Sequence, residues 1–421
     1  MTAERRLRVT LLTLGSRGDV EPYLGLGVAL ARAGHAVTVA VSAGFERLAR
    51  RAGLQTLAVE PDPRLTADDG GPPLWLRPSA VEGVIRLRRA ARQASRPSGA
   101  YSGYLEAGRG ADVVLYPALL APIARTIGHR YGCALIPAYL APLHPTRAFP
   151  SPYLNLPLRP SWNRTSHLLA LRLSKAAMAG LPSSWRTPIP GGAPASLDPI
   201  PPRSEICLYG FSRHVLPPPP DWPPGVVVTG RWWFDASPDW RPPEELDRFL
   251  RAPGKVVFIG FGSMMDPRPA HLKATVETAL TRLGCRAILL TGPCQQLDLP
   301  RSPRWSGVED IPLDWLFRRV DAVVCHGGAG TVAQAARAGK PVVTIPFFGD
   351  QHFWGVQIHR AAGGPPPIPR RALTTQRLVS ALEMALEDSD GRERAARLGA
   401  RVRSEDGLAT AVRLIEARLG V

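Results

Sequence analysis

Apolar runs, glycine-containing polar turns and amphipathic segments alternate at the start of the chain. Leu7 to Leu14 is a short apolar run, and the polar stretch Gly15 to Pro22 follows it. Apolar residues then recur at helical spacing from Tyr23 to Ala33, and a second apolar run spans Ala36 to Val41. A strand, a helix and a second strand this close together predict a βαβ unit with a right-handed crossover.

The same alternation returns in the second half of the chain. Strands are predicted at Lys255 to Gly260, Ala287 to Thr291, Asp321 to Cys325 and Val342 to Pro346, and helices at His271 to Leu283 and Thr331 to Ala338. This order predicts a second doubly wound α/β layer. Two such layers form a cleft, and ligands of parallel sheets bind at the carboxyl ends of the strands.

A proline-rich run separates the two halves. Residues 217–224 read PPPPDWPP, which is unsuited to a helix or a central strand because proline lacks the amide donor and fixes φ. We therefore predict an N-terminal domain over 1–216, a linker over 217–224 and a C-terminal domain over 225–421. A length of 421 residues agrees with two domains.

The chain is strongly basic, with 52 Lys and Arg against 35 Asp and Glu and a net charge of +17. The arginines are spread over the sequence, apart from one cluster between Arg86 and Arg96, and no zinc-finger spacing or other nucleic-acid motif is present. We therefore expect no nucleic-acid partner. A solvated basic surface and contact with an acidic lipid surface both remain open.

Cysteine content and hydropathy bear on the compartment. The five cysteines are odd in number and share no CxxC spacing, which argues against a zinc site and a disulfide framework. No window of 18 uninterrupted apolar residues exists, so a membrane-spanning helix is not expected. These features predict a cytoplasmic protein without a cysteine-bound zinc site, with peripheral membrane contact as an open question.

The sequence HGGAGT connects a predicted strand to a predicted helix. Glycines let the backbone approach a ligand closely, and the amides at a helix start favour anions. The motif lacks the Lys-Ser/Thr ending of a P-loop, so a nucleoside triphosphate with magnesium is not indicated. It predicts an anion cradle, with a purely structural turn as the alternative, formed by His326, Gly327, Gly328, Ala329, Gly330 and Thr331.

A dinucleotide site competes with this interpretation. Gly328, Gly330 and Ala333 match GxGxxA, and Asp350 lies 20 residues beyond Gly330. However, Asp350 follows the predicted strand by several residues and stands in the polar turn FFGDQH beside Gln351. A carboxylate and an amide in such a turn suit the vicinal hydroxyls of a sugar, or Asp350 caps a helix that starts near Phe353.

Two further turns carry candidate chemistry. Asp19, in the turn GSRGD, either caps the following helix or faces the cleft and removes a proton from an incoming hydroxyl. Ser263, in the turn GFGSM, either donates to a phosphate or forms a local side-chain turn.

Four ordered motifs resemble those of a known enzyme class. They are GSRGDVEPYLGLGVALARAGHAVTVA (Gly15 to Ala40), IPLDWLF (Ile311 to Phe317), HGGAGT (His326 to Thr331) and IPFFGDQHFWG (Ile345 to Gly355). The chain resembles glycosyltransferases that move sugars from nucleotide diphosphates onto lipophilic acceptors, especially sterol 3-glucosyltransferases and bacterial glycopeptide and macrolide glycosyltransferases. The likeness runs from Leu7 to about Leu386, and residues 60–202 contribute little to it.

The resemblance implies the GT-B fold, in which two Rossmann-like domains face each other across a cleft, with a last helix over about 391–419 that packs back on the first domain. It implies an inverting, metal-independent transfer of a hexose, first of all glucose, from a UDP- or TDP-sugar, without a further cofactor. The partners are then this nucleotide sugar and a lipophilic small-molecule acceptor.

Site residues carry over by position. Asp19 is implied to be the general base that deprotonates the acceptor hydroxyl. The implied donor-binding residues are Ser16, Arg17 and Gly18 at the donor's edge, Gly262, Ser263 and the turn His326 to Thr331 at the diphosphate, Val308 and Ile311 where the base is contacted, and Asp350 with Gln351 at the sugar hydroxyls. Leu313 stands where the sterol enzymes usually have a histidine, and no clear aromatic residue is available to stack on the base.

The acceptor is left open by the sequence. Segments Leu74 to Ile85 and Trp162 to Trp185 contain apolar and aromatic residues that could line an acceptor pocket or pack in the core. Sterol, hopanoid, macrolide, polyketide and peptide aglycones all fit. Two other functions remain alternatives: a catalytically inactive glycosyltransferase-like binding protein, and an NAD(P)-dependent enzyme.

Overall fold

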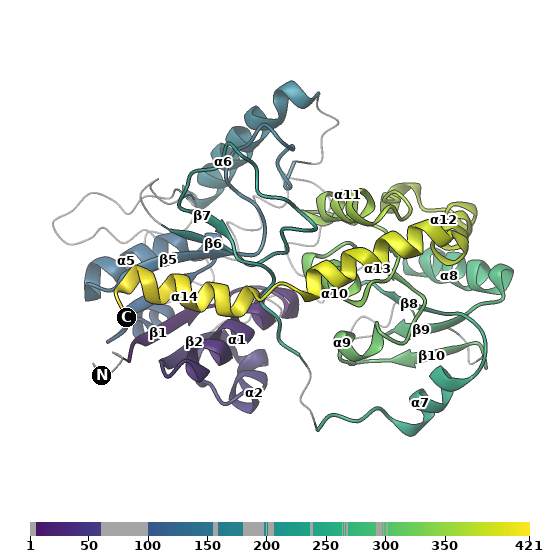
Figure 1. Ribbon diagram of the computed structural model, residues 1–421, viewed down its shortest axis with the longest axis horizontal. Helices are drawn as coiled ribbons and strands as arrows, with labels where there is room; N and C mark the ends of the chain where they lie inside the picture. The colour runs from purple at the N-terminus through teal and green to yellow at the C-terminus, as the bar shows by residue number, and fades with distance from the viewer. Residues whose placement is uncertain are drawn as a thin grey trace. The chain divides into compact units, whose positions relative to one another are not determined.

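The computed structural model of the chain describes residues 6–59, 100–154, 159–179, 206–235, 239–262, 268–291 and 302–421, with the single residues 198, 200, 264, 266, 297 and 299. The chain divides into two compact units (Figure 1). Unit 1 comprises Met1–Arg213, Pro218–Phe234 and Asp406–Val421, and unit 2 comprises His214–Pro217 and Asp235–Glu405. The basic cluster Arg86 to Arg96, the segment Leu74 to Ile85 and Ser263 lie outside the described residues.

Unit 1 is a parallel sheet with helices between its strands. Its elements are β1 (Arg8–Leu12), α1 (Arg17–Arg32), β2 (Ala36–Ser42), α2 (Ala43–Arg51), β3 (Gln55–Val59), α4 (Ala100–Ala107), β4 (Val113–Tyr116), η2 (Ala118–Leu120), α5 (Ala121–Tyr131), β5 (Ala134–Tyr139), η3 (Pro160–Trp162), α6 (Asn163–Ala179), β6 (Cys207–Tyr209), β7 (Val226–Val228) and α14 (Gly407–Leu419). Among the described residues the strand order is β3-β2-β1-β4-β5-β6-β7. Leu11 on β1 pairs with Val39 on β2 and with Leu115 on β4, which confirms the predicted first βαβ unit.

Helix α1 begins six residues earlier than the apolar periodicity predicts. Ser16 takes an extended conformation as the N-cap, and the Asp19 carboxylate accepts a hydrogen bond from the Ser16 backbone N–H at 2.8 Å. This contact satisfies an amide at the helix start, so the polar segment Arg17 to Pro22 is the first part of a helix rather than a turn.

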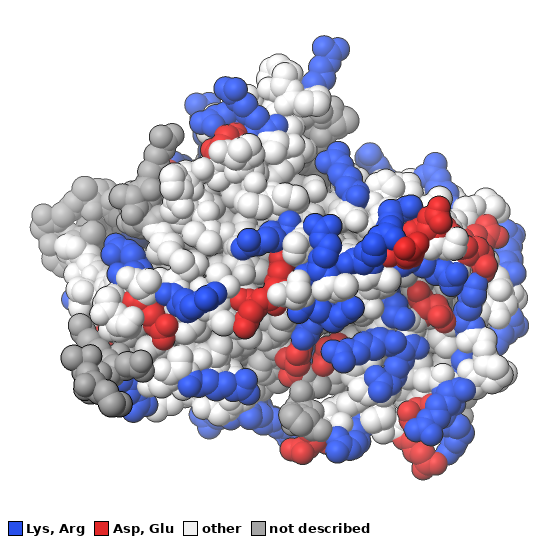
Figure 2. All heavy atoms as spheres, in the orientation of Figure 1, with Lys and Arg blue, Asp and Glu red and all other residues white. Residues whose placement is uncertain are grey.

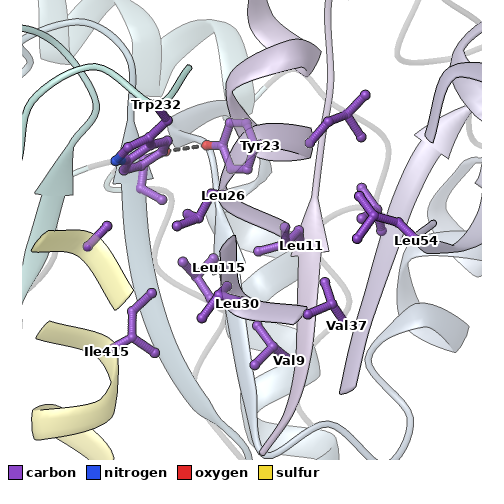
Figure 3. Close-up of a cluster of buried hydrophobic side chains, with 14 of the residues drawn as sticks. Val9, Leu11, Tyr23, Leu26, Leu30, Val37, Leu54, Leu115, Trp232 and Ile415 are labelled. Atoms are coloured by element: carbon purple, nitrogen blue, oxygen red, sulfur yellow. Dashed lines mark hydrogen bonds between the residues drawn. The ribbon is translucent and has the colours of Figure 1, made fainter. Parts of the chain in front are cut away.

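The core of unit 1 lies between the sheet and helices that come from both ends of the chain (Figure 3). Tyr23 of α1 donates a hydrogen bond to the carbonyl of Ala138, and its ring packs edge-on against Trp232 at 5.9 Å. Helix α14 contributes Ala411 and Ile415 to the same cluster. The C-terminal segment therefore completes the core of the N-terminal half.

Unit 2 repeats the architecture on a smaller scale. Its elements are α7 (Glu244–Arg251), β8 (Val256–Gly260), α8 (Pro269–Leu283), β9 (Arg286–Leu290), β10 (Trp305–Val308), α9 (Leu313–Leu316), β11 (Ala322–Cys325), α10 (Ala329–Ala338), β12 (Val342–Thr344), α11 (Gln351–Ala362), η5 (Arg370–Ala372), α12 (Thr375–Glu387) and α13 (Ser389–Arg403). In the part of the chain that is described, the parallel strands follow the order β10-β9-β8-β11-β12.

Two predicted boundaries differ from the structure. Residues 218–234 belong to unit 1, because β7 pairs in parallel with β6, so the chain passes into unit 2 at Asp235 rather than within the predicted linker 217–224. The single helix predicted over about 391–419 is two helices, and Asp406 caps the second one by accepting from the Ala409 N–H at 2.9 Å. Only the second helix, α14, belongs to unit 1.

Candidate functional site

Three of the predicted site turns lie at one edge of the unit 2 sheet. Gly260 of β8 pairs with Cys325 of β11, and Cys325 pairs with Thr344 of β12, so the three strands end side by side. The strand order changes direction between β8 and β11, because β9 and β10 lie on one side and β12 on the other. Such a switch point leaves a crevice beyond the carboxyl ends of the strands, where ligands of open α/β sheets bind.

The His326 ring lies between two glycines of this edge. A Cβ added to Gly328 would meet His326 Nε2 at 2.3 Å, and one added to Gly262 would meet Cε1 at 3.2 Å. Gly262 also has a φ of +58°, which favours glycine. The glycines that the sequence placed in a cradle therefore also make room for the imidazole.

His326 is neutral near pH 7. Burial lowers the pKa of its imidazole to about 4, and its Nδ1 is buried without a hydrogen-bond partner among the described residues. A neutral imidazole carries one N–H donor and one acceptor nitrogen. His326 can thus offer a hydrogen bond to an anion, but the positive potential must come from elsewhere.

The start of α10 supplies that potential. Gly328 is the N-cap, and Ala329, Gly330 and Thr331 form the first turn of the helix, two residues earlier than predicted. The first amides of a helix have no intrahelical acceptor, and the helix dipole adds about half a positive charge at this end. The predicted anion cradle consists of a short loop, His326 to Gly328, and this helical turn.

Gln351 lies between the cradle and the turn Phe347 to His352, for which sugar binding was predicted. A Cβ on Gly327, which has a φ of +86°, would come within 2.6 Å of the Gln351 carbonyl oxygen. The Gln351 side chain is 4% exposed. Its Oε1 accepts from the Phe347 and Phe348 amides at 2.8 and 3.2 Å, and its Nε2 lies 3.0 Å from the Met264 sulfur. In this arrangement Gln351 holds the turn in shape, and a contact with sugar hydroxyls stays a prediction.

Asp350 takes the helix-cap position that was the alternative to its sugar-binding role. It is the N-cap residue of α11, which begins at Gln351 rather than near Phe353. Its Oδ2 accepts a hydrogen bond from the Trp354 indole N–H at 2.9 Å. The residue is half-buried, so its carboxylate is fixed in direction while part of it remains accessible. A fixed acceptor of this kind suits a ligand hydroxyl.

The two residues predicted near the donor base differ in exposure. Val308 ends β10 and is half-buried, and its carbonyl oxygen accepts from the Thr291 N–H at 2.9 Å. Ile311 is 5% exposed, so its side chain packs inside unit 2. Val308 is therefore the better placed of the two to contact a base.

Asp19 lies at the corresponding edge of unit 1. The strand order β2-β1-β4 places β3 and β2 on one side of β1 and β4 to β7 on the other, so the turn after β1 is at a switch point. Both Ser16 N–H and Ser16 Oγ donate to Asp19 Oδ2 at 2.8 Å. Arg17 and Gly18 are exposed in the first turn of α1, where Arg17 also pairs with Glu21 at 2.5 Å.

The positive charge of a buried arginine, Arg231, interacts with the Asp19 carboxylate, and the sequence analysis did not identify this residue. Arg231 is 5% exposed, and it lies where α1 and α14 both touch the backbone of residues 230–233: a Cβ on Gly25 or Gly407 would collide with Trp233 or Arg231 carbonyl atoms. Burial lowers the pKa of Arg231 to about 10, which leaves it charged near pH 7. One signal was available in the sequence, namely a single charged residue between VVVTG and WWF.

Opposing influences set the protonation of Asp19. Desolvation by the surrounding protein raises the pKa of its carboxyl group, whereas the hydrogen bonds from Ser16 and the charge of Arg231 lower it. Desolvation is the largest of these influences, and the pKa of the Asp19 carboxyl group is raised above its usual value. In its ionised form this carboxylate can accept a proton, which is the state that a general base requires.

Gly15 gives the first test of this geometry. It has a φ of +120°, and an added Cβ would meet Asp19 Oδ2 at 2.5 Å and Cγ at 2.9 Å. Gly15→Ala is therefore expected to displace the Asp19 carboxylate. If Asp19 is the base, as predicted, kcat should fall by about tenfold or more, since a small misplacement of a catalytic group is costly. Steady-state kinetics measures this loss.

Gly34→Ala is the matched control. Gly34 also lies in unit 1 with a positive φ, +94°, but an added Cβ meets nothing within 4 Å. Backbone strain should lower the free energy of unfolding of both variants by a similar amount, about 1–3 kcal/mol. Equal activity in the two variants would show that the position of Asp19 does not matter.

Comparisons with known proteins match both halves of the chain. Residues 9–101 match the glycosyltransferase family 28 N-terminal domain, and residues 294–416 match the erythromycin biosynthesis protein CIII-like C-terminal domain. The chain has the GT-B fold of solved glycosyltransferases. The calicheamicin glycosyltransferase CalG4 shares the fold with a TM-score of 0.67 and 18% identity, covering 99% of each chain. Glycosyltransferase VinC in complex with dTDP matches with a TM-score of 0.65 and 17% identity, covering 98% of this chain and 99% of VinC.

A curated relative is more similar in sequence. The sterol 3-beta-glucosyltransferase of Emericella nidulans is 33% identical over 428 residues, which cover 97% of this chain. This chain spans 30% of that relative's length. The predicted α/β fold and the resemblance to this enzyme class are thus confirmed, and the individual site residues stay predictions.

Two absences apply to the described residues. No group of three or more His, Cys, Asp and Glu side chains there is placed to hold a metal ion. In the same part of the chain, no helix is both long and apolar enough to cross a membrane.

Proposed function

We propose that this protein transfers a hexose, with glucose as the first candidate, from a UDP- or TDP-sugar to a hydroxyl group of a lipophilic acceptor. Sterols, polyketides and other natural-product aglycones are the acceptor classes. Unit 2 would bind the donor and unit 1 would supply the base. The observation that carries this proposal is the register of the unit 2 sheet, which brings Gly262, the cradle His326 to Thr331 and Asp350 to one edge.

The donor diphosphate would lie against the start of α10. Its oxygens can accept hydrogen bonds from the Ala329, Gly330 and Thr331 amides and from the neutral His326 imidazole. These groups are fixed before the reaction and face the place where negative charge accumulates as the leaving group departs. On this proposal the amides and the helix dipole stabilise the leaving diphosphate without a metal ion.

Asp19 would start the transfer as general base. Its carboxylate takes the proton of the acceptor hydroxyl while the hydroxyl oxygen attacks the anomeric carbon. The new bond between that oxygen and the anomeric carbon forms as the bond from this carbon to the diphosphate oxygen breaks, and the nucleoside diphosphate carries the electron pair away. Attack from the face opposite the leaving group inverts the anomeric carbon. Arg231 keeps a positive charge near Asp19 and favours its ionised form.

Nucleotide binding distinguishes this proposal from the dinucleotide alternative. UDP or TDP should raise the melting temperature by a few degrees at a concentration well above Kd, because a ligand that binds the folded state stabilises it. NADH at the same concentration should leave it unchanged. Thermal melts with the three nucleotides provide the measurement, and stabilisation by NADH alone would favour the oxidoreductase.

An inactive binding protein is the remaining alternative. Asp19, the cradle and the Asp350–Gln351 pair are all present, and the described ones among them keep the geometry given above. A protein that only binds the nucleotide would be stabilised by UDP or TDP and would form no glycoside. Product analysis therefore separates this alternative from the proposal.

A further inference from the structure

Helix α6 attaches to unit 1 through polar side chains. Asn163, Ser166 and His167 are 6%, 3% and 2% exposed. Asn163 Nδ2 donates to the Arg147 carbonyl at 2.9 Å, Ser166 Oγ accepts from the Ser151 N–H at 2.8 Å, and His167 Nε2 lies 3.1 Å from the Phe149 carbonyl oxygen. A helix on a globular domain normally buries an apolar stripe, whereas α6 buries polar side chains.

The solvent side of the same segment is apolar. Trp162 is 56% exposed, Leu168 43%, Leu169 45% and Leu173 48%. Leu169 and Leu173 are one helical turn apart and share a face. Among the described residues, these four account for most of the large hydrophobic side chains that are exposed. Scattered exposed leucines are ordinary, but a group on one helix marks an interaction surface, so core packing does not explain these residues.

Basic residues accompany this apolar face. Residues 160–179 contain no Asp or Glu, and Arg164 and Arg172 are exposed among the leucines. Figure 2 shows basic side chains gathered on the part of unit 1 that carries α6. The acidic residues nearby are already engaged: Asp198 pairs with Lys175 at 2.5 Å, and Asp221 accepts from Thr146 Oγ1 and the Arg147 N–H.

The combination selects a class of partner. Leucines with a tryptophan match the boundary between lipid headgroups and acyl chains, and arginines beside them match headgroup phosphates. A second copy of this chain would bring like charges together, and the protein carries a net charge of +17. We propose that Trp162 and α6 dock the protein on an anionic lipid surface, with Leu169 and Leu173 entering the interface and Arg164 and Arg172 contacting phosphates.

This docking surface is independent of the transfer reaction. It would hold the protein where a lipophilic acceptor concentrates, but vesicle binding can be measured without donor or acceptor. Failure of the docking proposal would leave the proposed function intact, and the reverse also holds.

Co-sedimentation with vesicles tests the proposal. The full chain should bind vesicles of phosphatidylcholine with phosphatidylglycerol better than phosphatidylcholine alone, and added salt should weaken binding. The double variant Leu169→Asp with Leu173→Asp should lose binding to the anionic vesicles by about tenfold or more, since two apolar side chains no longer enter the interface. Arg164→Gln with Arg172→Gln should mainly remove the preference for anionic lipid.

Met384→Asp is the control, because Met384 is an equally exposed apolar residue, at 45%, on α12 of unit 2. Circular dichroism melts check that each variant remains folded, which is expected for substitutions at exposed positions. Absence of vesicle binding by the unaltered protein would overturn the proposal. So would unchanged binding by the leucine variant, or an equal loss in Met384→Asp.

Discussion

Replacing Asp19 by asparagine is expected to lower kcat by about 100- to 10,000-fold, the usual contribution of a general base. Asparagine has nearly the same shape and can still accept the hydrogen bond from the Ser16 N–H, which spans 2.8 Å in the native protein. It cannot take a proton from an acceptor hydroxyl. On the proposed function the diphosphate is held by unit 2, so the affinity for UDP or TDP should stay within about twofold. Kinetics and calorimetry measure the two quantities.

A distant carboxylate controls for the loss of charge. Glu46 lies on α2 of the same unit and pairs with Arg50 at 2.5 Å on the surface. Glu46→Gln removes one negative charge from unit 1 and should leave kcat unchanged. If Asp19→Asn retained the native turnover, the role of Asp19 as base would be wrong, and its contact with Ser16 would then serve only to start helix α1.

Gly328→Ala is expected to weaken donor binding by about ten- to a hundredfold, the value of a lost hydrogen bond to a charged group. Gly328 has a φ of −62° that alanine tolerates, so the backbone is not strained. The new Cβ would meet His326 Nε2 at 2.3 Å and force the ring out of its place. Calorimetric titration with UDP and TDP measures the change.

Gly284→Ala is the matched control in the same unit. Gly284 has a φ of +60° at the end of α8, and an added Cβ meets nothing within 4 Å. This variant should lose stability through backbone strain and keep the native donor affinity. Equal affinities in Gly328→Ala and the native protein would mean that His326 does not contact the donor.

The sequence predicts the parts of the fold that depend on local patterns. The apolar runs that become β1, β8 and β11 are each followed by glycine turns, and this succession determines a parallel sheet. The candidate anion-binding turn is predictable because glycines and a helix start indicate an anion site within a few residues. Their proximity could not be deduced until the register joined Gly260, Cys325 and Thr344.

Contacts between distant segments explain what the sequence did not predict. Strand β7 joins the first sheet through pairing with β6, and α14 fills the core beneath Tyr23, although both follow the proline-rich run. The Gln351 side chain is held by main-chain amides and the Ile311 side chain is buried, and residue type alone does not indicate this burial. Arg231 could not be identified from the sequence, because only the folded chain brings it near Asp19.

Helix α6 shows a further limit of pattern reasoning. From the sequence, the apolar and aromatic residues between Trp162 and Trp185 were expected to pack in the core or to line an acceptor pocket. The structure buries Asn163, Ser166 and His167 instead, because carbonyl and amide groups of residues 147–151 face the helix and need partners. Apolar residues in a sequence do not by themselves show whether they pack against the protein or face the solvent.

The most direct test of the central claim is the mass of the acceptor after reaction with a UDP- or TDP-hexose, measured for the native protein and for Asp19→Asn. Purified protein is incubated with each donor and with sterol and polyketide acceptors, and products are analysed by mass spectrometry. We predict that the native protein adds one hexose to an acceptor and that Asp19→Asn leaves it unmodified. Equal product from both proteins, or none from a native protein that binds the nucleotide, would contradict the account.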